Sequence, residues 1–262
     1  MPSTSRPTKS GPGPSLQRAA VATAAAAAGA TFAHLAPGLV CLRRLRSAAL
    51  PGLAGIGRAD HVALTFDDGP DPVSTPAVLD ELDRLGVRAT FFVLGSQVRR
   101  AGALTAELVE RGHELGVHGD THTNHLKRPW WWVTDDLRRA RDLVEGAAGT
   151  EVRWFRPPYG AYAASSIVGA RQVGLQTVLW TTWGKDWRPG IEADDVVGMV
   201  RATMRRGATV LLHDSDVTSA PDSWKRTLAA LPVLVDDWRG AGLSVGPLRD
   251  HGVGSGRRHR RP

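Results

Sequence analysis

The chain has 262 residues, of which 42% are hydrophobic and 23% are charged, so one domain of about 200 residues with a sizeable core fits, with tails on both sides. The formal net charge of +7 comes from those tails: seven Lys/Arg and no acid lie in residues 1–58, four arginines lie in 257–261, and 22 basic against 26 acidic residues remain between them. This balance excludes a strongly basic body, so we expect no nucleic-acid partner, and the single cysteine, Cys41, excludes an intramolecular disulfide.

The first 60 residues differ in composition from the rest. Residues 1–18 are rich in Pro, Ser, Gly and Thr and hold three basic residues, which predicts a disordered basic tail. Residues 19–42 carry no formal charge and are dominated by alanine, so they resemble a signal-peptide core or a weak membrane anchor, with a soluble Ala-rich helix as the alternative. We expect an extracytoplasmic protein, secreted or anchored. The predicted linker is 43–59, the domain 60–248, and a second basic disordered tail 249–262.

From residue 61 onward, short apolar runs typical of buried strands alternate with amphipathic runs typical of helices. Strands are predicted at 61–64, 89–94, 114–117, 152–155, 176–180 and 208–213, helices at 74–86, 98–111, from 134, 163–173, 192–206 and 221–239, and a loop at the tryptophan run 130–132. This order predicts an α/β fold with a parallel sheet and outer helices, either a distorted or incomplete (β/α) barrel or a doubly wound sheet. In both, functional groups collect where strands end.

Two adjacent carboxylates, Asp67 and Asp68, follow the first predicted strand. At the end of a buried strand they repel each other and lose hydration. A bound cation would relieve both costs, because one carboxylate becomes a ligand while the other stays ionised and can accept a proton. The alternative is an acidic turn, since Asp, Gly and Pro all favour turns.

Two histidines, His118 and His122, follow a later predicted strand at four-residue spacing. On a helical turn this spacing places both imidazoles on one face. With Asp68 they would form a site of two nitrogens and one oxygen with an open position, which suits Zn²⁺, with Co²⁺, Ni²⁺ or Fe²⁺ as substitutes. Taken alone, a surface pair without a ligand is the alternative.

Three more polar residues follow predicted strands. Arg156 lies in a rigid Arg-Pro-Pro-Tyr-Gly turn and would pair with Asp67, the alternative being an exposed arginine in a plain loop. Asp186 follows a tryptophan-rich stretch. His213 ends the last long apolar run; many such histidines are structural, but opposite an Asp/His site it would be a general acid.

Five motifs, in this order, resemble the polysaccharide deacetylases of the NodB-homology family, carbohydrate esterase family 4, over about residues 60–248. The motifs are Thr65-Phe-Asp-Asp-Gly69, His118-x-x-x-His122, Arg156-Pro-Pro-Tyr-Gly160, Asp186-Trp187 and Leu211-x-His213. Each motif alone is weak, and the ordered set is specific. The resemblance implies a distorted (β/α) barrel that hydrolyses acetyl groups from a glycan.

The resemblance also implies a role for each matching residue. These roles are a metal site (Asp68, His118 and His122), a base with its partner (Asp67 and Arg156), an acid with its partner (His213 and Asp186) and a substrate pocket (Leu211, Trp187 and the backbone N–H of Tyr159).

Two positions depart from the family pattern. The residue three before Asp186 is usually an aspartate and is Trp183 here, which puts the details of the substrate groove in question. Gly119 lacks the hydroxyl that often supports the metal loop, so we expect the surroundings of the ligands to differ.

We therefore expect a metal-dependent hydrolase that removes N-acetyl groups from a chitin oligomer, peptidoglycan or a related cell-envelope polysaccharide. The motifs do not separate this activity from an O-acetyl glycan esterase or a deacylase of a lipid-linked sugar. A catalytically silent glycan-binding envelope protein is the alternative from another class, and the presence of every catalytic residue type argues against it. The sequence gives no basis for an oligomeric state.

Overall fold

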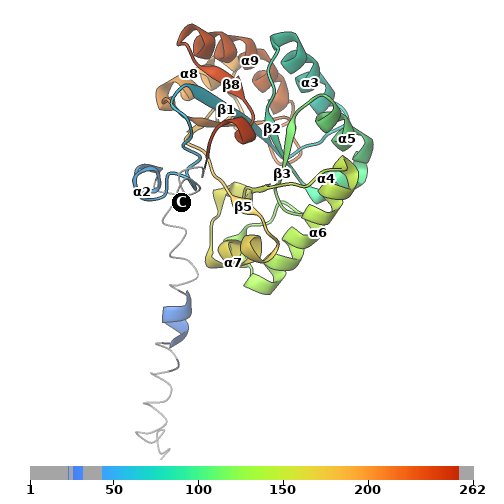
Figure 1. The fold of residues 1–262 in the computed structure, drawn as a ribbon, viewed down its shortest axis with the longest axis vertical. Helices are drawn as coiled ribbons and strands as arrows, with labels where there is room; N and C mark the ends of the chain where they lie inside the picture. Colours follow the sequence, from blue (N-terminus) through green and yellow to red (C-terminus); the bar gives the residue numbers. More distant parts are fainter. Residues whose placement is uncertain (1–22, 24–25, 32–42, 254–262) are drawn as a thin grey trace, which may run out of the picture.

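The computed structural model describes residue 23 and residues 26–31 and 43–253 (Figure 1). The predicted tail at 1–18, most of the apolar segment 19–42 and the end of the predicted C-terminal tail lie outside the described residues. In the part of the chain that is described, no helix has both the length and the apolar character that a membrane span requires.

In the described residues, eight strands form one sheet, and each pair of neighbouring strands is parallel. The strands are β1 His61–Asp67, β2 Thr90–Val93, β3 Glu114–Val117, β4 Trp154–Phe155, β5 Gln176–Thr177, β6 Thr182–Trp183, β7 Thr209–His213 and β8 Ser244–Gly246. Their order is β5-β4-β3-β2-β1-β7-β6, and β8 pairs with the first half of β1. Among the described residues, the two end strands β5 and β6 do not pair with each other, so the barrel is not closed. The predicted incomplete barrel is confirmed.

Helices lie on the outside of the sheet (Figure 1). They are α2 Arg43–Ala49, α3 Ser74–Leu85, α4 Gly95–Arg100, α5 Gly102–Glu110, α6 Trp130–Ala148, α7 Ala164–Gln172, α8 Ala193–Thr203 and α9 Ser223–Gly240, with 3-10 turns η2 His125–Lys127, η3 Pro158–Gly160 and η4 Leu248–Asp250. In α3 the buried stripe of Val78, Leu79 and Leu82 faces the sheet, and Gly86 ends the helix in the left-handed conformation at φ 62°.

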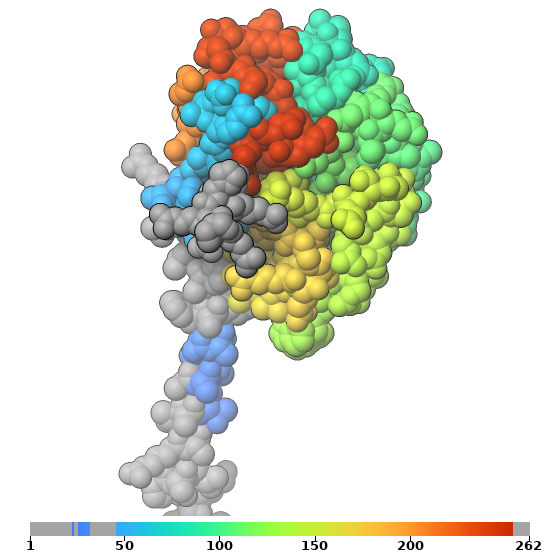
Figure 2. Space-filling view, in the orientation of Figure 1, coloured from blue at the N-terminus to red at the C-terminus, as the bar shows by residue number. Residues whose placement is uncertain are grey.

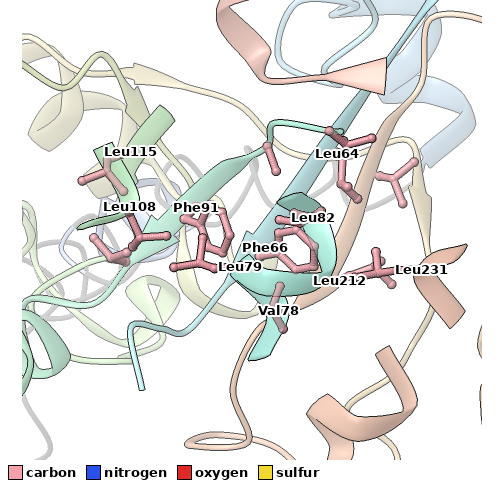
Figure 3. Close-up of a cluster of buried hydrophobic side chains, with 14 of the residues drawn as sticks. Leu64, Phe66, Val78, Leu79, Leu82, Phe91, Leu108, Leu115, Leu212 and Leu231 are labelled. Carbon is pink, nitrogen blue, oxygen red and sulfur yellow. The ribbon is translucent and has the colours of Figure 1, made fainter. Parts of the chain in front are cut away.

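Alternation along β1 decides which side chains reach the site. Leu64 and Phe66 point outward into the main core, where Figure 3 shows them beside Leu79, Leu82 and Phe91. With a period of two, Thr65 and Asp67 therefore face the inside of the barrel. The outward side chains of β1 therefore pack in the apolar core, and its inward side chains supply polar groups to the site.

The end of the barrel opposite the Asp67 end of β1 is closed by the C-terminal segment. A second apolar cluster fills this part of the interior and consists of Ala63, Phe92, Trp154, Val178, Leu248 and Val253. The backbone N–H of Leu248 donates to the Thr90 hydroxyl at 2.8 Å, and that of Arg249 donates to Glu114 at 2.9 Å. Barrel access is therefore directed towards the carboxyl ends of the strands.

The packed region extends past both predicted boundaries, 60 and 248. Within the expected linker 43–59, the carbonyl of Leu53 accepts the Leu179 N–H at 2.8 Å and that of Gly55 accepts the Thr209 hydroxyl at 2.6 Å. Within the expected tail, His251 is fully buried. Figure 2 shows the cyan segment leading into β1 against the orange-red C-terminal part. Tertiary contacts therefore hold parts of the expected linker and of the expected tail against the domain.

The predicted elements differ from those of the structure at several places, and the strands predicted at 152–155 and 176–180 are only Trp154–Phe155 and Gln176–Thr177. The tryptophan run predicted as a loop is the first turn of α6, where Trp130 and Trp131 remain 49% and 61% exposed and Trp132 packs on the core. The helix predicted at 98–111 is two helices, because Ala101 leaves helical geometry at φ −139° and ψ 46°. Strands β6 and β8 have two and three residues, too few to show a period in the sequence.

A buried histidine pair joins β1 to the C-terminal segment. The Nδ1 atoms of His61 and His251 lie 2.8 Å apart, and Nε2 of His251 lies 3.2 Å from the Gly207 carbonyl, which can only accept. His251 therefore donates from Nε2, and one of the two Nδ1 atoms donates to the other, so the two rings cannot both be charged. Burial lowers the pKa of both histidines, that of His251 to about 4.

We expect the free energy of unfolding to fall as pH is lowered from about 6.5 towards 4, because the unfolded chain protonates His251 in this window and the folded chain does not. This pKa difference corresponds to at most about 3 kcal/mol. His251→Gln should give a shallower decline than the wild type in urea unfolding measured at several pH values. Parallel profiles would contradict the assignment.

Candidate active site

The strand ends bring the predicted site residues together in a pocket of about 250 Å³. It is lined by Asp67, Asp68, His118, His122, Tyr159, Gly160, Trp180, Trp183, Trp187, Leu211, His213, Thr218 and Ser219. Eight of the ten predicted side chains are in this lining, and the other two, Arg156 and Asp186, are fully buried behind it. A larger hollow of about 570 Å³ near α2 and α8 is lined by neither carboxylates nor imidazoles, so the chemistry belongs to the smaller pocket.

Asp68 leaves the strand geometry at the point where β1 ends. Its φ of 82° is in the left-handed region, which aspartate tolerates better than most residues. In a regular strand, neighbouring side chains point to opposite faces, so Asp67 and Asp68 would diverge. The change of conformation instead leaves both carboxylates in the pocket lining.

Three groups converge on one point suited to a cation. The Oδ1 atom of Asp68 lies 3.4 Å from Nε2 of His118 and 3.5 Å from Nε2 of His122, and one ligand atom from each residue falls within 4.8 Å of the others. This Oδ1 is buried and has no hydrogen-bond partner among the described residues. An unpaired buried carboxylate oxygen facing two imidazole nitrogens is the arrangement that a divalent cation would satisfy.

The protonation of the two histidines is compatible with ligation. Nδ1 of His118 lies 2.8 Å from the carbonyl of Arg156 and must donate to it, which leaves the Nε2 lone pair free for a ligand bond. Burial, His122 and Arg156 hold the pKa of His118 well below its usual range. Burial also lowers the pKa of His122, against the opposing effect of Asp68. Both rings are therefore neutral at pH 7, as metal ligands must be.

Asp67 is held by a buried guanidinium. Arg156 donates to Oδ1 of Asp67 at 2.7 Å, to the Thr65 hydroxyl at 2.8 Å and to the Leu179 carbonyl at 3.1 Å. Burial raises the pKa of Asp67 to about 6, although Arg156 and His213 favour the ionised form. A carboxyl group that titrates near neutral pH beside the pocket is suited to accept and release a proton.

His213 lies near Oδ2 of Asp68, and its ring is oriented by Asp186. Its Nδ1 is 2.9 Å from Oδ1 of Asp186, while its backbone N–H and the Thr227 hydroxyl both donate to Oδ2 of Asp186 at 2.7 Å. Burial lowers the pKa of His213, but the carboxylates of Asp186, Asp68 and Asp67 more than compensate and raise it to about 10. Its Nε2, 3.8 Å from Asp68, therefore carries a proton.

An aromatic wall borders His213. The rings of Trp180, Trp183 and Trp187 follow one another with centroids 5.9 and 5.6 Å apart, and Trp187 lies 5.4 Å from the His213 ring. Trp183, where the resemblance led us to expect an aspartate, is thus part of an indole surface rather than a source of negative charge. Tyr159 also lines the pocket; its ring lies 4.3 Å from that of His122, and the residue is 66% exposed.

Thr218 is a site residue that the sequence did not single out. It lies in the loop between β7 and α9, lines the pocket, and donates its hydroxyl hydrogen to Oδ2 of Asp68. The same loop is tied to the aromatic wall, because the N–H of Ala220 donates to the Trp187 carbonyl at 3.1 Å. A threonine in a Ser/Thr-rich loop is too common a feature to identify from sequence.

Known proteins resemble the chain in sequence and in fold. Residues 54–178 match a family model described as polysaccharide deacetylase. The chain is 36% identical to a chitooligosaccharide deacetylase of Bradyrhizobium sp. (strain ANU 289), over 71% of this chain and 88% of that protein. Among solved structures, a peptidoglycan N-acetylglucosamine deacetylase superposes with a TM-score of 0.70 at 26% identity, over 77% of this chain and 92% of the other. A family 4 acetyl xylan esterase from Clostridium thermocellum, in complex with a cobalt ion, gives 0.66 at 30% identity, over 72% and 88%.

Removing the charge of Arg156 alone should destabilise the fold, because Asp67 would then be buried without a counterion. We expect Arg156→Met to reduce the free energy of unfolding by about 3–5 kcal/mol. The double variant Asp67→Asn/Arg156→Met should be more stable than the sum of the single effects predicts, by at least about 1 kcal/mol. Denaturant unfolding of the four proteins with metal chelated measures this coupling.

The matched control is Arg153→Met, which changes an exposed arginine of the same segment. It should shift the free energy of unfolding by no more than about 1 kcal/mol. Strictly additive effects of the Asp67 and Arg156 substitutions would show that the pair is not coupled.

Proposed function

Because the chain belongs to the polysaccharide deacetylase family, we propose that its pocket hydrolyses the amide bond of N-acetyl groups on a glycan. The observation that carries this proposal is the placement of two groups able to transfer protons beside one candidate metal site: Asp67 lies 3.8 Å from His118, and His213 lies 3.8 Å from Asp68. Amide hydrolysis needs a base for the attacking water and an acid for the leaving nitrogen, and this pocket offers both.

Asp68, His118 and His122 would hold the divalent cation. Two imidazole nitrogens and one carboxylate oxygen with an open position suit Zn²⁺ first, with Co²⁺, Ni²⁺ or Fe²⁺ as substitutes. When bound, the cation would polarise the acetyl carbonyl and make a water molecule more acidic. The partnerless Oδ1 of Asp68 and the two neutral imidazoles support this assignment.

Asp67 would take the proton of the water as it attacks the acetyl carbon. Arg156 fixes the orientation of this carboxylate through Oδ1 at 2.7 Å and favours its ionised form, which leaves Oδ2 directed towards the site, 3.8 Å from His118. The backbone N–H of Tyr159 is the proposed donor to the developing oxyanion, a contribution of about 3 kcal/mol for one such donor.

His213 would give its proton to the leaving amine, which departs poorly unless it is protonated. Asp186 holds Nδ1, so the proton available for transfer is on Nε2, the atom that faces the pocket side of Asp68. Leu211 and Trp187 beside it would contact the acetyl methyl group, and the indole surfaces suit the apolar faces of sugar rings.

We also propose that the protein acts outside the cytoplasmic membrane, with its N-terminal segment as a secretion signal or a membrane anchor. The uncharged, alanine-rich residues 19–42 support this placement. The envelope glycans that the pocket would process lie on the same side of the membrane.

Acetate release from a substrate panel tests the activity. We expect release from N-acetylated chitin oligomers or peptidoglycan, loss of release with a chelator, and recovery on addition of Zn²⁺ or Co²⁺. Release from O-acetylated xylan alone would instead identify an O-acetyl esterase. No release from any substrate, by a folded protein that still binds the glycan, would favour the catalytically silent alternative.

His213→Ala should lower the rate of acetate release from N-acetyl substrates by about 10²–10⁴-fold, while Zn²⁺ binding persists. Hydrolysis of 4-nitrophenyl acetate should fall much less, because its leaving group needs no proton. His251→Gln, at the other end of the barrel, should keep near wild-type activity at pH 7.5. If His213→Ala retains half of the amide hydrolysis, the acid has been wrongly assigned.

A further inference from the structure

The loop His118–His122 presents two ligands, but only one of them is fixed by its own hydrogen bond. His118 donates to the Arg156 carbonyl, whereas Nδ1 of His122 is buried and has no hydrogen-bond partner among the described residues. Metal-bound histidines are usually oriented by such a bond on the second nitrogen. The position of His122 therefore depends on the loop backbone and on the contacts of its ring with Tyr159 and His118.

Asp136, in the second turn of α6, contacts this backbone. Its Oδ2 accepts the N–H of Asp120 at 2.9 Å, and the backbone amides of Asp120 and Thr121 both favour its ionised form. The side chain is fully buried, and the other oxygen, Oδ1, has no hydrogen-bond partner among the described residues and lies 3.9 Å from Nη2 of Arg139. Burial raises the pKa of Asp136 to about 6. A helix that only had to pack on the core would gain more from an apolar residue here.

Gly119 and Asp136 are complementary in shape. Gly119 has a φ of 103°, and a Cβ atom added there would lie 3.1 Å from Oδ2 of Asp136 and 3.0 Å from the Thr121 carbonyl. The Asp136 carboxylate thus lies against the face of the loop where a side chain at 119 would begin. The support that a hydroxyl at this position would give from within the loop comes here from a neighbouring helix.

Other contacts secure the opposite side of the loop. The N–H groups of Gly95 and Ser96, at the start of α4, donate to the carbonyls of Gly119 and Asp120 at 3.0 and 2.9 Å. The Asp120 side chain accepts from Arg99 at 2.6 Å and from Arg139 at 3.3 Å. The loop is therefore held by hydrogen bonds from both α4 and α6. Asp136 is the residue of α6 that bonds the backbone between the two histidines.

We propose that Asp136 is a positioning residue for the metal site: from α6 it holds the backbone between His118 and His122 and so sets the position of the His122 imidazole. The inference rests on the metal site of the proposed function. It assigns no contact with substrate to Asp136, which acts only through the loop.

Zn²⁺ affinity, measured by competition with a chromogenic chelator, tests this role. Asp136→Ala should weaken Zn²⁺ binding by about 10- to 100-fold, the usual effect of losing a residue that supports a ligand. Asp136→Asn should stay within about threefold of the wild type, because its amide oxygen still accepts the Asp120 N–H. In Co²⁺-loaded protein, the Ala variant alone should show a changed visible absorption spectrum, since the ligand geometry relaxes.

The matched control is Asp135→Ala, which removes an exposed carboxylate from the adjacent position of α6 and should leave Zn²⁺ affinity unchanged. Wild-type affinity and an unchanged Co²⁺ spectrum in Asp136→Ala would overturn the inference. So would loss of the fold in metal-free Asp136→Ala, because that result would show a general structural role. If the wild type binds Zn²⁺ at this site but releases no acetate, the proposed deacetylation fails while the role of Asp136 stands.

Discussion

The buried guanidinium of Arg156 is the interaction on which the site depends. Its side chain joins Asp67 and Thr65 of β1 to the carbonyl of Leu179 beyond β5, and its own carbonyl fixes the ring of His118. A fully buried cation is costly unless it is paired and hydrogen-bonded, and here the two terminal nitrogens, Nη1 and Nη2, both donate hydrogen bonds, while Nε has no hydrogen-bond partner among the described residues. One residue thereby sets the charge of the candidate base and the tautomer of a candidate ligand, so the two cannot be arranged independently.

The histidines of the pocket show how their surroundings separate candidate ligands from a candidate acid. His118 and His213 are both buried, yet the first is neutral and the second is charged. His118 has a backbone carbonyl on Nδ1 and the charge of Arg156 nearby, whereas His213 has the Asp186 carboxylate on Nδ1. Burial opposes charge in each case, and the partner on the second nitrogen decides the outcome.

Most of the pocket residues could be predicted from the sequence because apolar runs show where the buried strands end. Apolar runs locate β1, β3 and β7, and Asp67, His118 and His213 lie at their ends or immediately after them, where a parallel sheet collects them. Thr218 and Asp136 could not be found in this way. Each acts through one hydrogen bond to a residue 150 or 16 positions distant, and neither bond leaves a mark in local composition. The start of α6 at Trp130 could not be predicted either. Three consecutive tryptophans show no helical period, and the buried residues of the helix begin only at Val133.

The central position of β1 has a consequence for how the chain acquires its structure. This strand comes early in the domain, but two of its three partners, β7 and β8, come near the end, and the Thr65 hydroxyl bonds a carbonyl 145 residues away. Such non-local pairing slows folding, because loop entropy is lost before the contacts form. During synthesis β1 can pair with β2 early, but its pairing with β7 and β8 is completed only after almost the whole domain has left the ribosome.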